Sequence, residues 1–203
     1  MQRTQPIESI SSNPDFRPLT SIKGISVDLR YASENNFVGR DLYSPLDCAW
    51  LHQQAAEGLE KTVVWLAAKR TNLRVLVLDA LRPQRVQEQL WEALQGTDLL
   101  GYLANPVRGS IHSFGMAIDI TLVNSHGREL DMGTPFDDLS ERSHPALEDA
   151  MLARGELSKL QIDNRQLLRD AMHVGGFSGI KSEWWHFDCG DRDVVRESFT
   201  RVL

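Results

Sequence analysis

The stretch Met116-Ala117-Ile118-Asp119-Ile120-Thr121-Leu122-Val123 decides the fold of this chain. Large apolar residues occupy every second position, and in an extended strand successive side chains point to opposite faces. We therefore predict a strand over 116–123 that packs one face on the core. The same alternation places Asp119 on the opposite face, away from that core side.

A histidine lies just before this strand, in the segment Ser110-Ile111-His112-Ser113-Phe114-Gly115. Because glycine adopts backbone conformations that other residues avoid, Gly115 allows a sharp turn after His112. The strand then brings Asp119 back beside His112. A histidine and an aspartate at this spacing are also typical of a capped turn and a surface carboxylate, but the glycine and the strand alternation favour a pair of metal ligands.

A second polar cluster stands near the other end, in Glu183-Trp184-Trp185-His186. We predict that the chain returns as a strand through 183–188. Glu183 and His186 are three positions apart and would face opposite sides of a regular strand, so we place Glu183 in the turn that leads into it. Taken alone, this tetrapeptide also fits an edge strand with two buried tryptophans and a surface glutamate.

Together the two stretches predict a catalytic zinc site. Such a site usually takes three protein ligands and leaves the fourth position to water, with a non-ligating carboxylate nearby as general base. His112, Asp119 and His186 fill the first role, and Glu183 fills the second. We expect one Zn²⁺ per chain.

The first half of the chain contains further predicted elements. Residues 27–31 alternate like a short strand, and Asp47 is a suitable cap for a helix over 47–70. The apolar run 74–80 predicts a central strand. Pro83 suits the first turn of the next helix, so Arg82 is predicted at a strand-to-helix corner, where side chains tend to face clefts.

The second half completes the expected fold. We predict a hairpin turn at 124–127, a long irregular loop over 131–145, and helices over 145–156 and 163–174, the second ending at Gly175-Gly176. Strands grouped around helices without regular β-α-β alternation favour an α+β fold with a mainly antiparallel sheet flanked by helices.

Composition and charge narrow the classes of protein to which this chain can belong. A chain of 203 residues with 41% hydrophobic and 25% charged residues fits a single soluble domain over 1–203, with 1–25 as a polar N-terminal arm. The net charge of −6 and the lack of a basic stripe argue against nucleic acid. No segment predicts a membrane span, and Met1 to Ile25 lacks the apolar core of a secretory signal.

Two cysteines, Cys48 and Cys189, are too few for a disulfide framework. We therefore expect a cytoplasmic protein, or a periplasmic one if a signal peptide has been removed. The sequence does not define an oligomeric state.

The sequence resembles the zinc D-alanyl-D-alanine dipeptidases, the VanX family, from about Asp28 to Phe187. The family segment Ser-x-His-x-x-Gly-x-Ala-x-Asp stands here as Ser110, His112, Gly115, Ala117 and Asp119, and Glu-x-Trp-His stands as Glu183, Trp185 and His186. Further matches are Tyr31, Asn36-Phe37-Val38-Gly39, Asp79-Ala80-Leu81-Arg82-Pro83, Asp131-Met132-Gly133-Thr134-Pro135-Phe136-Asp137 and Glu141-Arg142-Ser143-His144.

This resemblance implies hydrolysis of a small dipeptide, D-Ala-D-Ala, by an α+β fold shared with D,D-carboxypeptidases and the hedgehog signalling domain. It implies Arg82 at the carbonyl oxygen and Asp137 near the substrate amine, with Tyr31 as its helper. We expect Ser110 to meet the substrate carboxylate, and His144 to end the loop that covers the site.

Two alternatives stay open: a D,D-carboxypeptidase acting on peptidoglycan peptides, and a non-catalytic zinc-binding recognition module. The presence of both Glu183 and Arg82 argues against the module, because a purely structural zinc needs neither. Ile111 and Phe114 depart from the family pattern, in which a small polar and a basic residue stand at these places.

Overall fold

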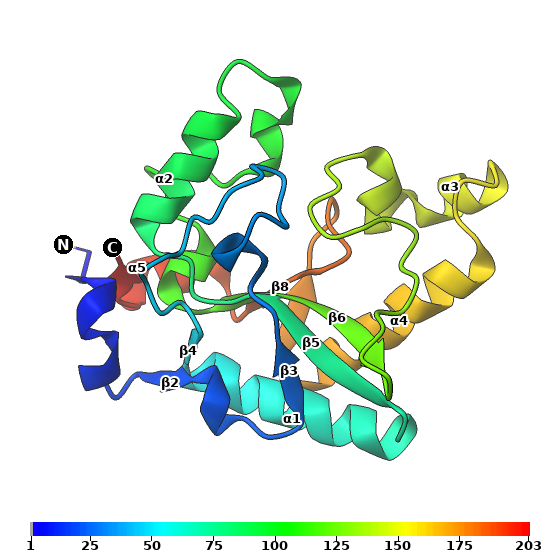
Figure 1. Cartoon of the computed structure of the whole chain (residues 1–203), viewed down its shortest axis with the longest axis horizontal. Coiled ribbons are helices and arrows are strands. Elements are labelled where there is room, and N and C mark those ends of the chain that lie inside the picture. The colour runs from blue at the N-terminus through cyan, green and yellow to red at the C-terminus, as the bar shows by residue number, and fades with distance from the viewer. Residues whose placement is uncertain (1) are drawn as a thin grey trace.

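A five-stranded sheet forms the centre of the computed structural model, which describes residues 2–203 (Figure 1). The strands, in spatial order, are β3 (Ile25–Val27), β5 (Leu73–Asp79), β6 (Ala117–Asn124), β8 (His186–Cys189) and β7 (Phe177–Gly179). β3 and β5 run parallel, and all other neighbouring strands are antiparallel. The predicted α+β class with a mainly antiparallel sheet is therefore confirmed.

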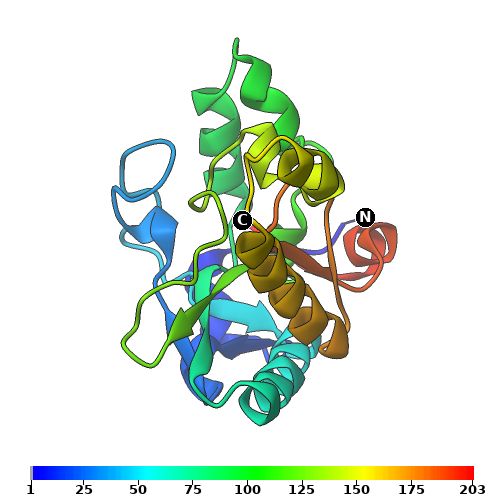
Figure 2. The same cartoon turned by 90° about the vertical axis from the view of Figure 1, so that its right-hand side faces the viewer.

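One face of the sheet packs on two long helices, α1 (Gln53–Lys69) and α4 (Lys159–Val174), which lie next to each other (Figure 2). Ile118, Ile120 and Leu122 of β6 belong to the core cluster that these helices complete. The helices approach closely at Gly58, where a Cβ atom would lie 2.5 Å from the carbonyl oxygen of Gly175. The alternation predicted for 116–123 thus points its apolar residues at the helices.

The opposite face of β6 carries Asp119, as predicted, but it is not open to solvent. Thr121 on the same face is fully buried, and Asp119 is 2% exposed. A second apolar cluster, of Leu76, Leu78 and Val123 with Phe136 against it, covers part of this face. A buried carboxylate needs polar partners, and these are found in the site below.

The N-terminal residues form part of the packed structure instead of the predicted polar arm. β1 (Thr4–Gln5) pairs in parallel with β9 (Arg201–Val202), and β2 (Phe16–Pro18) pairs with β4 (Trp50–His52). Ile7, Ile10 and Phe16 are buried in one cluster with Val202. Their apolar side chains, spaced among polar residues, hold the described N-terminal end beside the C-terminus (Figure 1).

The remaining helices are short. They are α2 (Gln84–Ala93), α3 (Glu148–Ala153) and α5 (Arg192–Ser198), with 3₁₀ turns η1 (Ile7–Ser12), η2 (Leu19–Ser21), η3 (Arg30–Ala32), η4 (Asp98–Tyr102), η5 (Ile111–Phe114), η6 (Glu141–Ser143) and η7 (Pro145–Leu147). None of the helices in the described part of the chain has the length and apolar character that crossing a membrane requires.

Two predicted elements in the first half are wrong at their boundaries. β3 ends at Val27, and Tyr31 lies in η3, so 27–31 is not a strand. Helix α1 begins at Gln53, and its N-cap is His52, whose Nδ1 accepts from the backbone N–H of Gln54 at 3.2 Å, instead of Asp47. The Asp47 carboxylate instead accepts hydrogen bonds from the backbone N–H of Ala49 and the indole of Trp50, which closes a turn before β4.

The second half also differs in its helix limits. The helix predicted over 145–156 is split into η7 and α3. α4 begins at Lys159, earlier than predicted, because Ser158 and Gln161 form a reciprocal capping box. Gly176, with φ of +82°, takes the left-handed conformation after the helix, and Gly175 does not. β8 starts at His186, so Glu183 precedes the strand as predicted.

Candidate metal centre and active site

All the residues that the sequence predicted for the site line one cavity of about 820 Å³. They are Tyr31, Arg82, Ser110, His112, Asp119, Asp137, Glu183 and His186. They come from segments that are up to 155 residues apart in the sequence, and the sheet brings them together where Asp119, near the start of β6, pairs with His186, at the start of β8.

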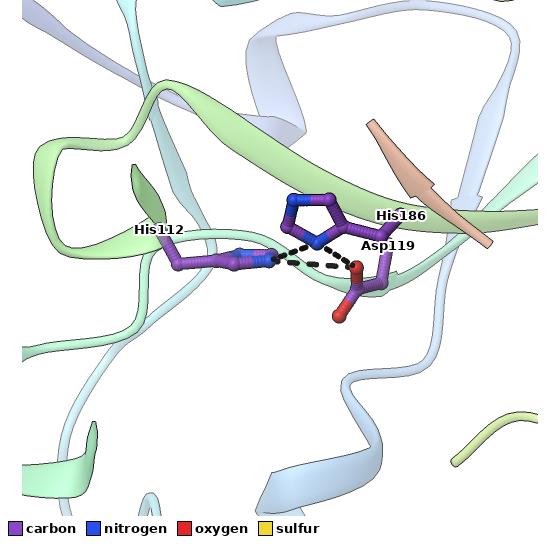
Figure 3. Close-up of side chains that lie close together, drawn as sticks. All are labelled: His112, Asp119 and His186. Carbon is purple, nitrogen blue, oxygen red and sulfur yellow. Dashed lines mark hydrogen bonds and ion pairs between the residues drawn. The ribbon is translucent and has the colours of Figure 1, made fainter. Parts of the chain in front are cut away.

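The three predicted ligands lie in direct contact (Figure 3). Asp119 and His186 are paired across β6 and β8, with Oδ1 of Asp119 3.0 Å from Nδ1 of His186. Nε2 of His112, which comes from η5, lies 3.1 Å from the same nitrogen and 3.4 Å from Asp119 Oδ1. One nitrogen from each histidine and one carboxylate oxygen therefore converge on a common point.

The far side of each imidazole is fixed by an acceptor. Nδ1 of His112 lies 2.8 Å from the carbonyl oxygen of Ala80, and Nε2 of His186 lies 3.0 Å from a carboxylate oxygen of Asp188. A carbonyl or carboxylate only accepts, so each of these nitrogens carries the hydrogen. The other nitrogen of each imidazole can then offer its lone pair to a metal ion held between the two histidines and Asp119, as ligation requires.

Sequence reasoning missed the role of Asp188. This residue stands two positions after His186, so both side chains share one face of β8, which is the signal that was available. Asp188 also accepts a hydrogen bond from Nε of Arg192 at 2.5 Å. Burial opposes ionisation, but the charges and hydrogen bonds of His186 and Arg192 together outweigh it and lower the pKa of Asp188.

The charge balance of this cluster suits a cation. Burial works against a charged imidazole, yet Asp188 and Asp119 raise the pKa of His186 well above its ordinary value. Burial likewise opposes the Asp119 carboxylate, and His112 and His186 outweigh it and lower the pKa of Asp119. A donor set of two imidazole nitrogens and one carboxylate oxygen fits Zn²⁺.

Gly115 sets the position of His112, as the sequence predicted. It ends η5 with φ of +64°, in the left-handed region that favours glycine. A Cβ atom at this position would lie 2.7 Å from the backbone nitrogen of His52. A larger residue would therefore push the η5 turn, and His112 with it, away from β4.

Arg82 is buried at the predicted corner between β5 and α2. Its Nε and Nη2 donate to Oδ2 of Asp79 at 2.9 and 2.6 Å, its Nη1 donates to Gln87 at 3.1 Å, and its Nη2 lies 3.4 Å from Asp119 Oδ2. The guanidinium also stacks on the Tyr31 ring at 4.9 Å. These contacts hold Arg82 rigidly in the wall of the cavity.

Asp79 and Gln87, which hold the guanidinium, were not predicted as site residues. The Tyr43 hydroxyl donates to the other oxygen of Asp79, so the carboxylate is itself oriented. Burial opposes the charge of Arg82, but Asp79, Tyr31, Tyr43 and Asp119 together outweigh it and raise the pKa of Arg82 well above its usual value. The guanidinium is therefore charged at every physiological pH.

Asp137 presents a free carboxylate oxygen to the site. Its Oδ1 accepts from the Tyr31 hydroxyl at 3.1 Å, while its buried Oδ2 has no hydrogen-bond partner within residues 2–203. Burial and then the charge of Asp119 raise the pKa of Asp137 well above its ordinary value. Its φ of +62° is rare outside glycine. A buried carboxyl group that lacks a partner on one oxygen and lies in a strained turn indicates a binding role, because a bound cation would lower this pKa and pair with the carboxylate.

Glu183 is partly buried in the cavity wall, before β8. Burial, only partly offset by His186, raises the pKa of Glu183 to about 7. Such a carboxyl group gains and loses a proton near neutral pH, which suits a general base. Ser110 is 5% exposed and precedes η5 at the edge of the same cavity.

The residues around the ligands divide between cavity and core. Trp185 lines the cavity, whereas the Trp184 indole donates to Thr134 Oγ1 at 2.8 Å. Ile111 lines the cavity as well, while Phe114 is fully buried beneath the guanidinium of Arg201. Of the two departures from the family pattern, only Ile111 borders the site.

Comparison with known proteins gives a consistent set of relatives. The sequence model of the D-ala-D-ala dipeptidase family matches residues 15–202. The D-alanyl-D-alanine dipeptidase of Escherichia coli K12 is 38% identical over 167 residues, which cover 81% of this chain and 78% of the relative. The D-alanyl-D-alanine dipeptidase of Enterococcus faecium is 31% identical over 202 residues, covering 88% of this chain and 92% of the relative.

Among solved structures, the chain is similar to the LdcB LD-carboxypeptidase. The TM-score is 0.48 at 16% identity, and the match covers 93% of this chain and 75% of that one.

Proposed function

Because this chain belongs to the D-Ala-D-Ala dipeptidase family of metallopeptidases, we propose that it hydrolyses free D-alanyl-D-alanine with one zinc ion. Peptide hydrolysis follows from the family, while the substrate, the metal and the residue roles are our proposal. One observation carries it: the lone pairs of His112, Asp119 and His186 converge in a cavity that also holds Glu183 and the unpaired oxygen of Asp137.

Zinc bound by His112, Asp119 and His186 supplies an acidified water and a Lewis acid for the peptide carbonyl. Glu183 is the general base: it takes a proton from the attacking water and passes it to the leaving amine. A carboxyl group with a pKa of about 7 can perform both transfers near neutral pH.

Arg82 stabilises the oxyanion that develops on the carbonyl oxygen. A guanidinium has five N–H donors, and four are engaged by Asp79, Gln87 and Asp119. One N–H on Nη1 is left for the substrate. Because the other four fix the side chain in place, this donor is oriented before the reaction starts. Oxyanion donors stabilise the transition state most when they need no reorientation as the charge develops.

Asp137 binds the substrate ammonium. Its free Oδ2 gains the charged partner that it lacks within the described chain, and Tyr31 holds the other oxygen in position. Ser110, at the edge of the same cavity, receives the substrate carboxylate.

Both cysteines are free, which supports the cytoplasmic location that we propose for this activity.

The test is a substrate panel on protein of measured zinc content. We expect rapid release of D-alanine from D-Ala-D-Ala, and little cleavage of L-Ala-L-Ala, N-acetyl-D-Ala-D-Ala or a tripeptide ending in D-Ala-D-Ala. A preference for the blocked or longer peptides would support the carboxypeptidase alternative. A zinc-loaded protein that cleaves none of these peptides would support the recognition module.

A further inference from the structure

A tyrosine and a histidine that the proposed mechanism does not use meet beside the cavity. The hydroxyl of Tyr102 lies 2.8 Å from Nε2 of His144, and the two rings stand 5.5 Å apart between centroids. Tyr102 ends η4, in the segment after α2, whereas His144 joins η6 to η7. Both segments project above the sheet in Figure 1, so the contact ties together two parts of the cavity rim.

Each side of this bridge is anchored separately. On one side, Gln87 and Gln84 on α2 donate to the carbonyl oxygens of Ala104 and Pro106, both at 2.9 Å. On the other side, the N–H of Ala146 donates to the carbonyl oxygen of Lys181 at 3.3 Å. Within residues 2–203, the Tyr102–His144 contact is the only hydrogen bond or ion pair between segments 94–109 and 131–147.

The bridge joins Tyr102 to the segment 131–147, which also carries Asp137, the residue proposed to bind the substrate amine. Tyr102 lines the cavity, as does Leu139 on the loop that carries Asp137. Burial and then the negative charges of Glu141, Glu183 and Asp138 raise the pKa of the Tyr102 phenol. The phenol is therefore close to the general base and to the ammonium-binding loop.

The volume of the cavity does not explain a restriction to dipeptides. Pockets of roughly 300–1,000 Å³ accept drug-sized ligands, and this cavity measures about 820 Å³. Two alanine residues need much less room than that. Something other than size must keep longer peptides from placing their last two residues at the metal centre.

We propose that the Tyr102–His144 bridge closes the amine end of the cavity and selects dipeptides with a free amino group over N-terminally extended peptides. This inference rests on the proposed dipeptidase function. An acyl group or a preceding residue on the substrate nitrogen would have to pass between segments 94–109 and 131–147, which the bridge holds together. Tyr102 and His144 are specificity residues in this scheme, and the chemistry stays with Glu183 and Arg82.

The experiment compares Tyr102→Phe, His144→Ala and the double variant with the zinc-loaded wild type. kcat/KM is measured for D-Ala-D-Ala, for N-acetyl-D-Ala-D-Ala and for a tripeptide ending in D-Ala-D-Ala. The ratio of extended to free substrate should rise about two- to tenfold in each single variant, the range expected for loss of one hydrogen bond. Because both variants remove the same contact, the double variant should gain no more than either. His126→Ala, in an exposed turn, is the matched control.

A second measurement does not depend on activity. Amide hydrogen exchange in 140–147 should become faster in Tyr102→Phe, although the substitution lies in the other segment. Unchanged exchange there would overturn the bridge, and faster exchange with an unchanged substrate ratio would overturn its role in specificity. A wild-type protein that does not cleave D-Ala-D-Ala would instead refute the proposed function, while the exchange experiment still tests the bridge itself.

Discussion

Asp119 and His186 face each other across adjacent antiparallel strands, with a carboxylate oxygen 3.0 Å from an imidazole nitrogen. The backbone pairing of β6 with β8 therefore fixes two of the three proposed ligands. Two residues further along β8, Asp188 lies on the same face and orients His186. Because these groups sit on rigid strands, the ligand geometry is largely preformed.

We predict that the purified protein binds one zinc ion per chain and that His112→Ala and His186→Ala abolish this binding. Either substitution leaves two ligands, too few for a stable zinc site. Elemental analysis after dialysis measures the stoichiometry. His173→Ala, at an exposed position on α4, should bind zinc like the wild type. Full zinc content in both ligand variants would contradict the assignment.

Asp188→Asn should weaken zinc binding about 10- to 100-fold without removing a ligand. An asparagine oxygen can still accept the hydrogen bond from His186, but the negative charge that makes the imidazole more basic is lost. Competition with a chromogenic chelator measures the affinity. Asp149→Asn, on the exposed side of α3, serves as the control. An unchanged zinc affinity in Asp188→Asn would leave Asp188 with a purely structural role.

Glu183→Gln should abolish turnover while zinc is retained, and it should also stabilise the metal-free protein at alkaline pH. Burial raises the pKa of Glu183 from 4.5 to about 7. The folded state therefore holds this proton more tightly than the unfolded state, and stability falls as the pH rises from about 4.5 through about 7. A shift of this size corresponds to about 3 kcal/mol.

Urea denaturation of chelator-treated wild type and Glu183→Gln checks this prediction. The two free energies of unfolding should be similar near pH 4.5, and the variant should be more stable at pH 8. A difference that does not change with pH would show that the Glu183 carboxyl group is not desolvated. Loss of zinc from the untreated variant would place Glu183 among the ligands.

The sequence predicted the site better than it predicted the element boundaries. The alternation in 116–123 and the turn at Gly115 are local signals, and they suffice to bring His112 beside Asp119. Asp47 misled the prediction because a helix cap and a turn use the same side-chain acceptor, and only the tertiary pairing of β4 with β2 decides between them.

Residues that act through distant partners were not predictable. Tyr102 and His144 are 42 positions apart, and no periodicity links them. Asp79 carries no sequence signal for the hydrogen bond that it accepts from Tyr43, 36 positions away. The apolar residues of the N-terminal segment, such as Ile7 and Phe16, are too widely spaced to predict their burial against Val202.

Arg82→Lys should lower kcat by about 100- to 1,000-fold, the usual loss for an oxyanion donor. Lysine keeps the positive charge but cannot satisfy Asp79 and Gln87 and also reach the substrate, because it lacks the planar fork. Steady-state kinetics on zinc-loaded variant protein measure the effect, with the circular dichroism spectrum as a control for folding. Near wild-type activity would remove Arg82 from the mechanism.

Asp137→Asn tests how the substrate amine is recognised. Asparagine tolerates the positive φ of this position, so the loop should keep its shape while the carboxylate charge is lost. A hydrogen bond to a charged group contributes about 1.5–3 kcal/mol, so kcat/KM for D-Ala-D-Ala should fall about 10- to 100-fold. Cleavage of N-acetyl-D-Ala-D-Ala, which carries no ammonium, should change much less. An equal loss for both substrates would mean that Asp137 supports the fold of the site instead of pairing with the substrate charge.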